Sequence, residues 1–182
     1  MCSRLLLVLL TAAASVSAQD ICNLTSVPSA IRNQLRTDFS RWKVQEVASL
    51  STYLLDRWKS EQPAQCPGYV VGQFFNNKER AYGFLLVPTD PTAKGFRFVV
   101  FRRKTTESNY EQTVLAQTDN AEPGDYFIRS IQIAKEVSQR SRREFQMEAS
   151  DGIFLVDSGR DEYGVNVYFW TGSRFRSDPQ DR

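Results

Sequence analysis

The chain has 182 residues, of which 23 are lysine or arginine, 21 are aspartate or glutamate and none is histidine, so the formal net charge is +2. The absence of histidine excludes a Ser-His-Asp triad, a Cys-His nucleophile pair and any zinc site with histidine ligands. A net charge this close to zero gives no general attraction for nucleic acid or anionic lipid.

The first 18 residues have the pattern of a secretory signal peptide. Arg4 provides a short basic region, an apolar run from Leu5 to Val16 follows it, and small residues precede Ala18. We expect cleavage after Ala18, because the apolar run is shorter than the ~20 residues that span a bilayer. An uncleaved membrane anchor is the alternative. The sequence therefore predicts an exported protein, periplasmic or secreted, with no stable membrane insertion after cleavage.

Removal of residues 1–18 would leave 164 of the 182 residues, which is enough for one domain with its own core. We expect that domain to span residues 19–176, and a flexible polar tail to follow at 177–182. The sequence shows no internal repeat and no low-complexity linker.

Cleavage would also leave an even number of cysteines, because Cys2 would be lost while Cys22 and Cys66 remain. In an oxidising compartment we expect these two residues to form a disulfide. The bridge would close a loop of about 45 residues and stabilise the fold by at most roughly 4 kcal/mol. A free nucleophilic thiol is the alternative, although a lone exported thiol tends to oxidise.

Two helices are expected near the N-terminus. Residues 27–42 carry apolar side chains at helical spacing, with a proline in the first turn. Residues 49–60 carry a second apolar stripe, and the prolines and glycine of 62–68 end that helix. A short strand at 44–47 is expected between the two helices.

From Tyr69 onward the apolar pattern changes to a period of two, which favours strands. The expected strands are 69–75, 81–87, 96–101, 110–117, 126–133, 153–156 and 165–170. Residues 135–145 fit either a short helix or a loop. Short strands that follow two helices favour an α+β fold, with the two N-terminal helices packed on a meandering, mainly antiparallel β-sheet of about six or seven strands.

Catalysis would have to depend on carboxylates, since glycosidases need only two of them. The candidate groups are Glu148 with Asp151, and Asp157 with Asp161 and Glu162, all close to polar turns where acids are normally solvated. The sequence also lacks the glycine motifs of nucleotide-binding proteins. We therefore expect a non-enzymatic domain with no catalytic residue, no cofactor and no metal site.

The strand expected at 165–170 carries the candidate binding surface. Alternation along the strand places Asn166, Tyr168 and Trp170 on one face and three apolar residues on the other. If the first face is exposed, Tyr168 and Trp170, with Arg174 after the next turn, would form a recognition surface, because aromatic side chains anchor many interfaces. The alternative is that this face packs beneath the two helices.

Several short motifs resemble a pattern in small exported bacterial proteins of unknown function. The first motif is DF-x-x-W, at Asp38 to Trp42. The second is Cys66-Pro67-Gly68, followed by segments 72–74 and 81–86. The third is Asp151-Gly152-Ile153, followed by segments 167–170 and 172–175. The segment 72–79 is similar to a degenerate FG-GAP strand-loop-strand, but its loop lacks aspartates and contains Lys78. Because hard cations need several carboxylate or carbonyl oxygens, we expect a hairpin turn there and no bound calcium.

Three functions follow from these observations. The first is an exported non-enzymatic domain that binds a partner or ligand, such as a protein or glycan of the cell envelope or of the extracellular space. The second is a carboxylate-dependent hydrolase acting on glycans. The third is an inhibitor-like or accessory module for another exported protein. The sequence favours the first and does not identify the ligand.

Overall fold

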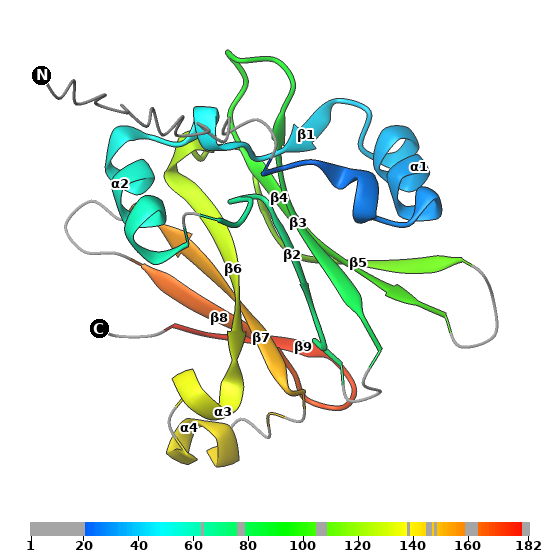
Figure 1. Cartoon of the computed structure of the whole chain (residues 1–182), viewed down its shortest axis with the longest axis vertical. Coiled ribbons are helices and arrows are strands. Elements are labelled where there is room, and N and C mark those ends of the chain that lie inside the picture. Colours follow the sequence, from blue (N-terminus) through cyan, green and yellow to red (C-terminus); the bar gives the residue numbers. More distant parts are fainter. Residues whose placement is uncertain are drawn as a thin grey trace, which may run out of the picture.

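The computed structural model describes residues 21–62, 64–75, 79–104, 109–137, 139–144, 147, 149–158 and 164–179. Within these residues the chain forms nine strands in two antiparallel sheets (Figure 1). The expected signal peptide and the polar positions 76–78 of the loop lie outside the described residues.

The first sheet is built around β3. Its strands are β1 (Trp42–Val44), β2 (Tyr69–Gly72), β3 (Ala81–Pro88), β4 (Phe96–Arg103) and β5 (Tyr110–Thr118). β1 and β2 pair with different parts of one edge of β3, and β4 pairs with its other edge. β5 pairs with β4 and is the last strand on that side of the sheet.

The second sheet is a simple meander in chain order. Its strands are β6 (Tyr126–Gln132), β7 (Asp151–Asp157), β8 (Val165–Trp170) and β9 (Phe175–Pro179). β6 begins beside the entrance to β2, where the Ile128 backbone N–H donates a 2.8 Å hydrogen bond to the Pro67 carbonyl oxygen. The two sheets therefore meet along β2 and β6, while β5 and β9 are their outer strands on the other side.

Apolar and aromatic side chains fill the space between the sheets. The ring of Phe98 in β4 meets that of Tyr168 in β8 edge to face at 5.1 Å, and Phe96 meets Tyr126 at 4.6 Å. Such contacts add to the area burial that holds stacked sheets together. The Asn166, Tyr168 and Trp170 face of β8 is thus directed at the first sheet.

Helices cover the outer faces of both sheets. They are α1 (Ser29–Asp38), α2 (Thr52–Glu61), α3 (Ile133–Glu136) and α4 (Gln139–Glu144), with 3₁₀ turns at Leu24–Ser26, Val47–Ser49 and Pro123–Asp125. α1 packs Ile31 on the first sheet against Phe84 and Phe101. α2 lies along β6, where Glu61 is 3.5 Å from Arg129 on the outer face of the second sheet.

The prediction of two helices on a single sheet of six or seven strands is wrong, because the strands form two packed sheets and the chain is mostly β. β3 shows the physical reason: residues 84–87 are all buried, since α1 covers one face and the second sheet covers the other. A strand buried on both faces has a continuous apolar run, and such runs do not reveal which strands share a sheet.

Several expected boundaries also shift. The first helix ends at Asp38 instead of residue 42, and the first strand is Trp42–Val44 instead of 44–47. Residues 135–145, which fitted a helix or a loop, contain parts of α3 and α4. β9 extends to Pro179, so the first part of the expected tail pairs with β8, and residues 180–182 lie outside the described part.

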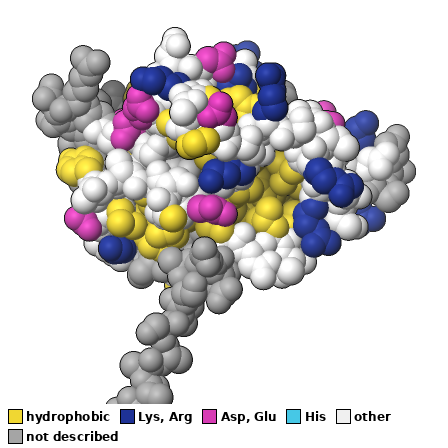
Figure 2. Space-filling view, turned by 90° about the horizontal axis from the view of Figure 1, so that it is seen from above, with side chains coloured by type: hydrophobic (Ala, Val, Ile, Leu, Met, Phe, Trp, Pro, Cys, Tyr) yellow, Lys and Arg dark blue, Asp and Glu magenta, His cyan; other side chains and the backbone are white. Residues whose placement is uncertain are grey.

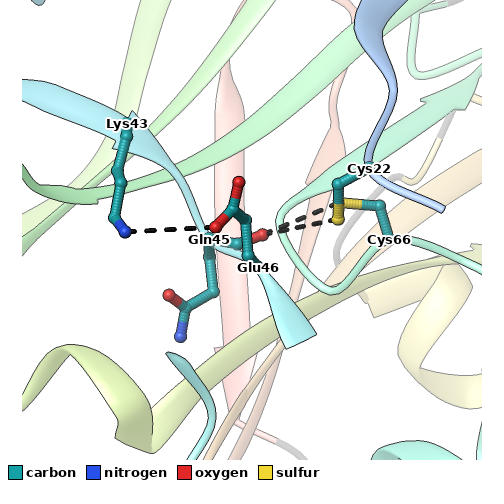
Figure 3. Close-up of a disulfide and its surroundings, with 5 residues drawn as sticks. All are labelled: Cys22, Lys43, Gln45, Glu46 and Cys66. Carbon is teal, nitrogen blue, oxygen red and sulfur yellow. Dashed lines mark hydrogen bonds and ion pairs between the residues drawn. A yellow bond between two sulfur atoms is a disulfide. The ribbon is translucent and has the colours of Figure 1, made fainter. Parts of the chain in front are cut away.

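Cys22 and Cys66 form a disulfide, with their Cα atoms 4.8 Å apart, in agreement with the pairing expected from the cysteine count (Figure 3). The Gln45 carbonyl oxygen lies 3.6 Å from the Cys66 sulfur. Gln45 is fully buried, and its side-chain amide donates hydrogen bonds to the carbonyl oxygens of Pro123 and Tyr126 at 2.8 and 3.3 Å. The bridge therefore fixes the N-terminal segment at the point where the two sheets meet.

Candidate functional site

A cleft of about 460 Å³ opens between the outer strands of the two sheets, and we call it the β5–β9 cleft. Arg102 of β4, Glu111 of β5 and residues 168, 170 and 173–177 contribute to its lining. The first sheet provides one wall and the second sheet the other. The cleft exists because β5 and β9 are not paired with one another, so the space between the sheets is reached from this side.

Three aromatic rings pack together at this cleft. The Trp170 ring centroid is 4.8 Å from that of Phe75 and 5.4 Å from that of Phe175, and Phe75 and Phe175 are 5.1 Å apart. The tilted and edge-to-face arrangements are those that aromatic rings prefer. Trp170 and Phe175 line the cleft, and Trp170 is only 9% exposed. These rings form a rigid apolar wall.

The guanidinium of Arg102 lies over this wall. Its central carbon is 5.0 Å from the ring centroid of Phe75 and 5.5 Å from that of Trp170, within the range of cation–π attraction. Two of its nitrogens also reach the same carboxylate oxygen of Glu111, at 2.8 and 2.9 Å. The stacking and the ion pair together fix the direction in which Arg102 presents its positive charge.

Two more arginines are part of the cleft lining. Arg174 follows a tight turn in which Gly172 has a φ of 90°, a left-handed conformation that favours glycine. The Thr171 hydroxyl and backbone N–H both donate hydrogen bonds to the Arg174 carbonyl oxygen at 3.0 Å, which hold this turn closed. Arg176 also borders the cleft, but it pairs with Phe169 in the β8–β9 register, so strand alternation directs its side chain to the face opposite Trp170 and Phe175. Arg102 and Arg174 against the single carboxylate of Glu111 still give the described lining a positive formal charge.

Two polar groups of β8 lie deeper in the wall. Burial raises the pKa of the Tyr168 hydroxyl above its usual value, so the phenol stays protonated and can donate a hydrogen bond at neutral pH. The indole N–H of Trp170 is buried and has no acceptor among the described residues. A buried donor without a partner is uncommon in native proteins, and an ordered water or a ligand often explains it.

The three residues of the expected binding surface, Tyr168, Trp170 and Arg174, all line this one cleft. Their face of β8 neither packs beneath the two helices nor lies open to solvent, because Tyr168 packs against Phe98 of the opposite sheet and Trp170 is buried. The basic run 102–104 could contact an acidic ligand, but sequence reasoning favoured a solvated strand end there, and it missed Glu111. The only signal of the Arg102–Glu111 pair was a basic residue and an acidic residue at the ends of two consecutive strands, which is common at solvated strand ends.

The acidic residues considered for catalysis are only partly described. Asp151 accepts a 2.7 Å hydrogen bond from the Gln73 backbone N–H, and Asp157 accepts a 3.2 Å bond from that of Gly164. Glu148, Asp161 and Glu162 lie outside the described residues. Within the described part of the chain, no group of three potential metal ligands comes together, and no helix is long and apolar enough to cross a membrane.

Comparison of the chain with family models, with curated proteins and with solved structures finds no match. The resemblance to small exported bacterial proteins, and to FG-GAP segments, therefore stays a prediction. The function proposed below depends on the geometry of the β5–β9 cleft.

Proposed function

We propose that this protein is exported and that it binds a small organic anion with a flat apolar body in the β5–β9 cleft. One observation carries the proposal: two arginines, Arg102 and Arg174, and a single carboxylate lie beside a wall of packed aromatic rings. An apolar surface with a few directed polar groups is the usual composition of a ligand site. The cleft volume of about 460 Å³ also falls within the range of small-molecule sites.

The arginines favour an anion. Arg174 is exposed and has no ion-pair partner among the described residues. Arg102 shares its charge with Glu111, but both side chains remain more than a third exposed, so a ligand carboxylate can approach the guanidinium. Guanidinium groups bind carboxylates through two parallel hydrogen bonds, which gives affinity and orientation together.

The aromatic wall favours a flat apolar body in the ligand. Phe175 is partly exposed beside the Trp170 ring, so an aromatic ligand can continue the same edge-to-face packing. The Tyr168 hydroxyl adds one hydrogen-bond donor to the same wall. Binding is favoured over glycoside hydrolysis, because the described lining contains one carboxylate and that chemistry needs two.

Export is supported by two features. The first 18 residues have the signal-peptide pattern, and the Cys22–Cys66 disulfide is of the kind that persists in an oxidising compartment. Mass spectrometry of the protein recovered from the periplasm or medium should give a chain that starts at Gln19. Protein that stays in the cytoplasm with residues 1–18 attached would contradict export.

Binding can be followed through the three tryptophan indole N–H signals in ¹H–¹⁵N spectra. Trp170 lines the cleft, whereas Trp42 and Trp58 do not. Titration with naphthalene-2-carboxylate, an anion with a flat apolar body, should move the Trp170 signal in a saturable way and leave that of Trp58 in place. No change at Trp170 up to millimolar ligand would refute the proposal.

A charge-reversal variant tests the role of the arginines. Arg174→Glu with Arg176→Glu should weaken binding by about tenfold or more, since each exposed pair contributes up to about 1 kcal/mol and reversal adds repulsion. Arg103→Glu is the control, because Arg103 is exposed on β4 next to Arg102 and does not line the cleft. Equal weakening in both variants would show that the attraction is not specific to the cleft.

A further inference from the structure

A second hollow, of about 340 Å³, lies between α1 and β1 on the outer face of the first sheet, and we call it the α1–β1 groove. Its apolar residues include Leu35 and Phe39 of α1, Trp42 and Val44 of β1, and Leu86 of β3. The face of the sheet that carries it is opposite to the face that borders the β5–β9 cleft. The two hollows are therefore separate sites.

The groove is open to solvent although its surface is apolar. Figure 2 shows hydrophobic side chains gathered in a hollow on this side of the molecule, with several lysine and arginine side chains and one acidic side chain beside it. Phe39 and Leu86 are buried, whereas Leu35, Trp42 and Val44 are partly exposed. The hollow arises because the ten-residue α1 meets the sheet beside the very short β1.

Positive charge surrounds this apolar surface. Arg32 and Arg36 are four residues apart on α1, so they lie on one side of the helix, and both line the groove. Lys43 lines it from β1 and is 4.0 Å from Glu46. None of the described residues that line the groove is acidic. A ligand that matches the groove must combine an apolar part with a negative charge.

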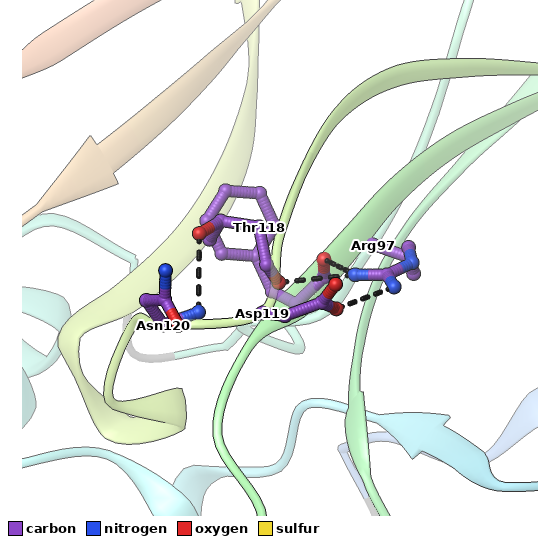
Figure 4. Close-up of polar contacts among 5 residues, drawn as sticks. Arg97, Thr118, Asp119 and Asn120 are labelled. Carbon is purple, nitrogen blue, oxygen red and sulfur yellow. Dashed lines mark hydrogen bonds and ion pairs between the residues drawn. The ribbon is translucent and has the colours of Figure 1, made fainter.

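Trp42 is held in a fixed position in the groove wall. The guanidinium of Arg97 stacks over its ring at 4.3 Å. Arg97 is itself fixed, because it donates hydrogen bonds to the Thr118 carbonyl oxygen at 3.0 Å and to the Asp119 carboxylate at 2.6 Å (Figure 4). The apolar wall is thus ordered before any ligand arrives, which reduces the entropy cost of binding.

We propose that the α1–β1 groove binds a single-chain amphiphile with a carboxylate head, such as a free fatty acid. The chain lies along Leu35, Phe39 and Trp42, and the carboxylate pairs with Arg32 and Arg36. The positive charges of Arg32 and Arg36 favour a carboxylate head group, and the recessed apolar lining of the groove favours one flexible chain. A bilayer would need apolar side chains that project, and the large exposed apolar residues of the described chain, Tyr53, Val71 and Val114, lie outside α1 and β1.

The indole signals of the full protein also test this proposal. Sodium dodecanoate should move the Trp42 signal in a saturable way and leave those of Trp58 and Trp170 in place. Dodecyltrimethylammonium has the same chain with the opposite charge, and it should bind at least about tenfold more weakly. Octanoate should bind at least about tenfold more weakly than dodecanoate, because it lacks four of the methylene groups that dodecanoate buries in the partly open groove. Equal binding of the cation and the anion, or no response at Trp42, would overturn the proposal.

A double variant identifies the residues that bind the head group. Arg32→Glu with Arg36→Glu should reduce dodecanoate affinity by about tenfold or more. Arg41→Glu provides a control for one such charge reversal at an exposed position that does not line the groove, and it should bind as the original protein does. Equal affinity of the double variant and the control would overturn the assignment of the head group.

Two further probes test other occupants. The protein should not co-sediment with vesicles of dioleoylphosphatidylglycerol when these are pelleted by centrifugation. A soluble acetylated peptide of alternating glutamate and leucine should not compete with dodecanoate. If the original protein sediments with the vesicles and the Arg32→Glu and Arg36→Glu variant does not, the groove contacts a membrane and the fatty-acid proposal is wrong. Binding of the peptide at lower concentration than dodecanoate would replace it with a protein partner.

Discussion

Removal of the Cys22–Cys66 disulfide should strongly destabilise the fold. The two residues are separated by 44 positions, and the chain-entropy relation for such a loop gives an entropy loss of about 13 cal/mol/K in the unfolded chain. At 25 °C this corresponds to about 4 kcal/mol of stabilisation, which is lost when the bridge is removed. Residual structure in the unfolded chain makes this an upper value.

The Cys22→Ala and Cys66→Ala double variant measures this loss by urea unfolding. Alanine is the better replacement at Cys66, which is buried, because a serine hydroxyl there would add a desolvation cost. With a denaturant slope of about 2 kcal/mol/M, the unfolding midpoint should fall by about 2 M. The slope itself should rise, because the unfolded chain without the bridge exposes more surface.

Chemical reduction of the original protein provides the control for the substitutions. The reduced protein and the double variant should have similar midpoints if the bridge itself is responsible. A loss below about 1 kcal/mol in both cases would refute the reasoning, since it would mean that the bridge does not restrict the unfolded chain as the loop length requires. A large loss in the variant alone would assign the effect to packing of Cys66.

Three further perturbations have defined outcomes. Gln45→Met should reduce the free energy of unfolding by about 2 kcal/mol, measured by urea unfolding, because the carbonyl oxygens of Pro123 and Tyr126 lose their donor; an unchanged midpoint would contradict it. Gly68→Ala should reduce the free energy of unfolding by about 2 kcal/mol, measured by urea unfolding, because an added Cβ would lie 2.4 Å from the Gln45 carbonyl oxygen. A variant with the stability of the original protein would contradict this, since it would mean that the backbone moves to relieve the clash. Burial raises the pKa of Tyr168 above its ordinary value of 10.0, so stability from this group is present below pH 10 and falls as pH rises through the higher folded pKa. The chain has seven tyrosines, so the absorbance of Tyr168 is obtained as the difference from a Tyr168→Phe variant. This difference should appear together with alkaline unfolding, and its appearance in fully folded protein at pH 10 would contradict the burial.

The individual strands were predictable, but their division into two sheets was not. Period-two alternation and turn residues locate β5, β6 and β8 to within a few positions. The local sequence does not show that β6 pairs with β7 and not with β5, because consecutive antiparallel strands have the same alternation of apolar residues whether they form one sheet or two. The disulfide was predictable from cysteine count alone, since removal of residues 1–18 leaves only one pair.

The candidate site was predictable only in part. Alternation identified Tyr168 and Trp170 as neighbours on one face of β8, and the cleft contains both. The partners Arg102 and Phe75 come from the first sheet, so their position depends on how the two sheets pack. The α1–β1 groove was not predicted, because residues 27–42 were expected to form one helix, whereas α1 ends before β1 and leaves Leu35 partly exposed beside it.

The most direct test of the account is the position of naphthalene-2-carboxylate in the complex, measured by intermolecular nuclear Overhauser contacts. The account predicts contacts from the ligand ring protons to Trp170 and Phe175, which line the β5–β9 cleft. At the same ligand concentration, these contacts should be strongly reduced in the Arg174→Glu and Arg176→Glu variant and persist in Arg103→Glu. Contacts to Trp42 and Leu35 instead, or none to either site, would contradict the account.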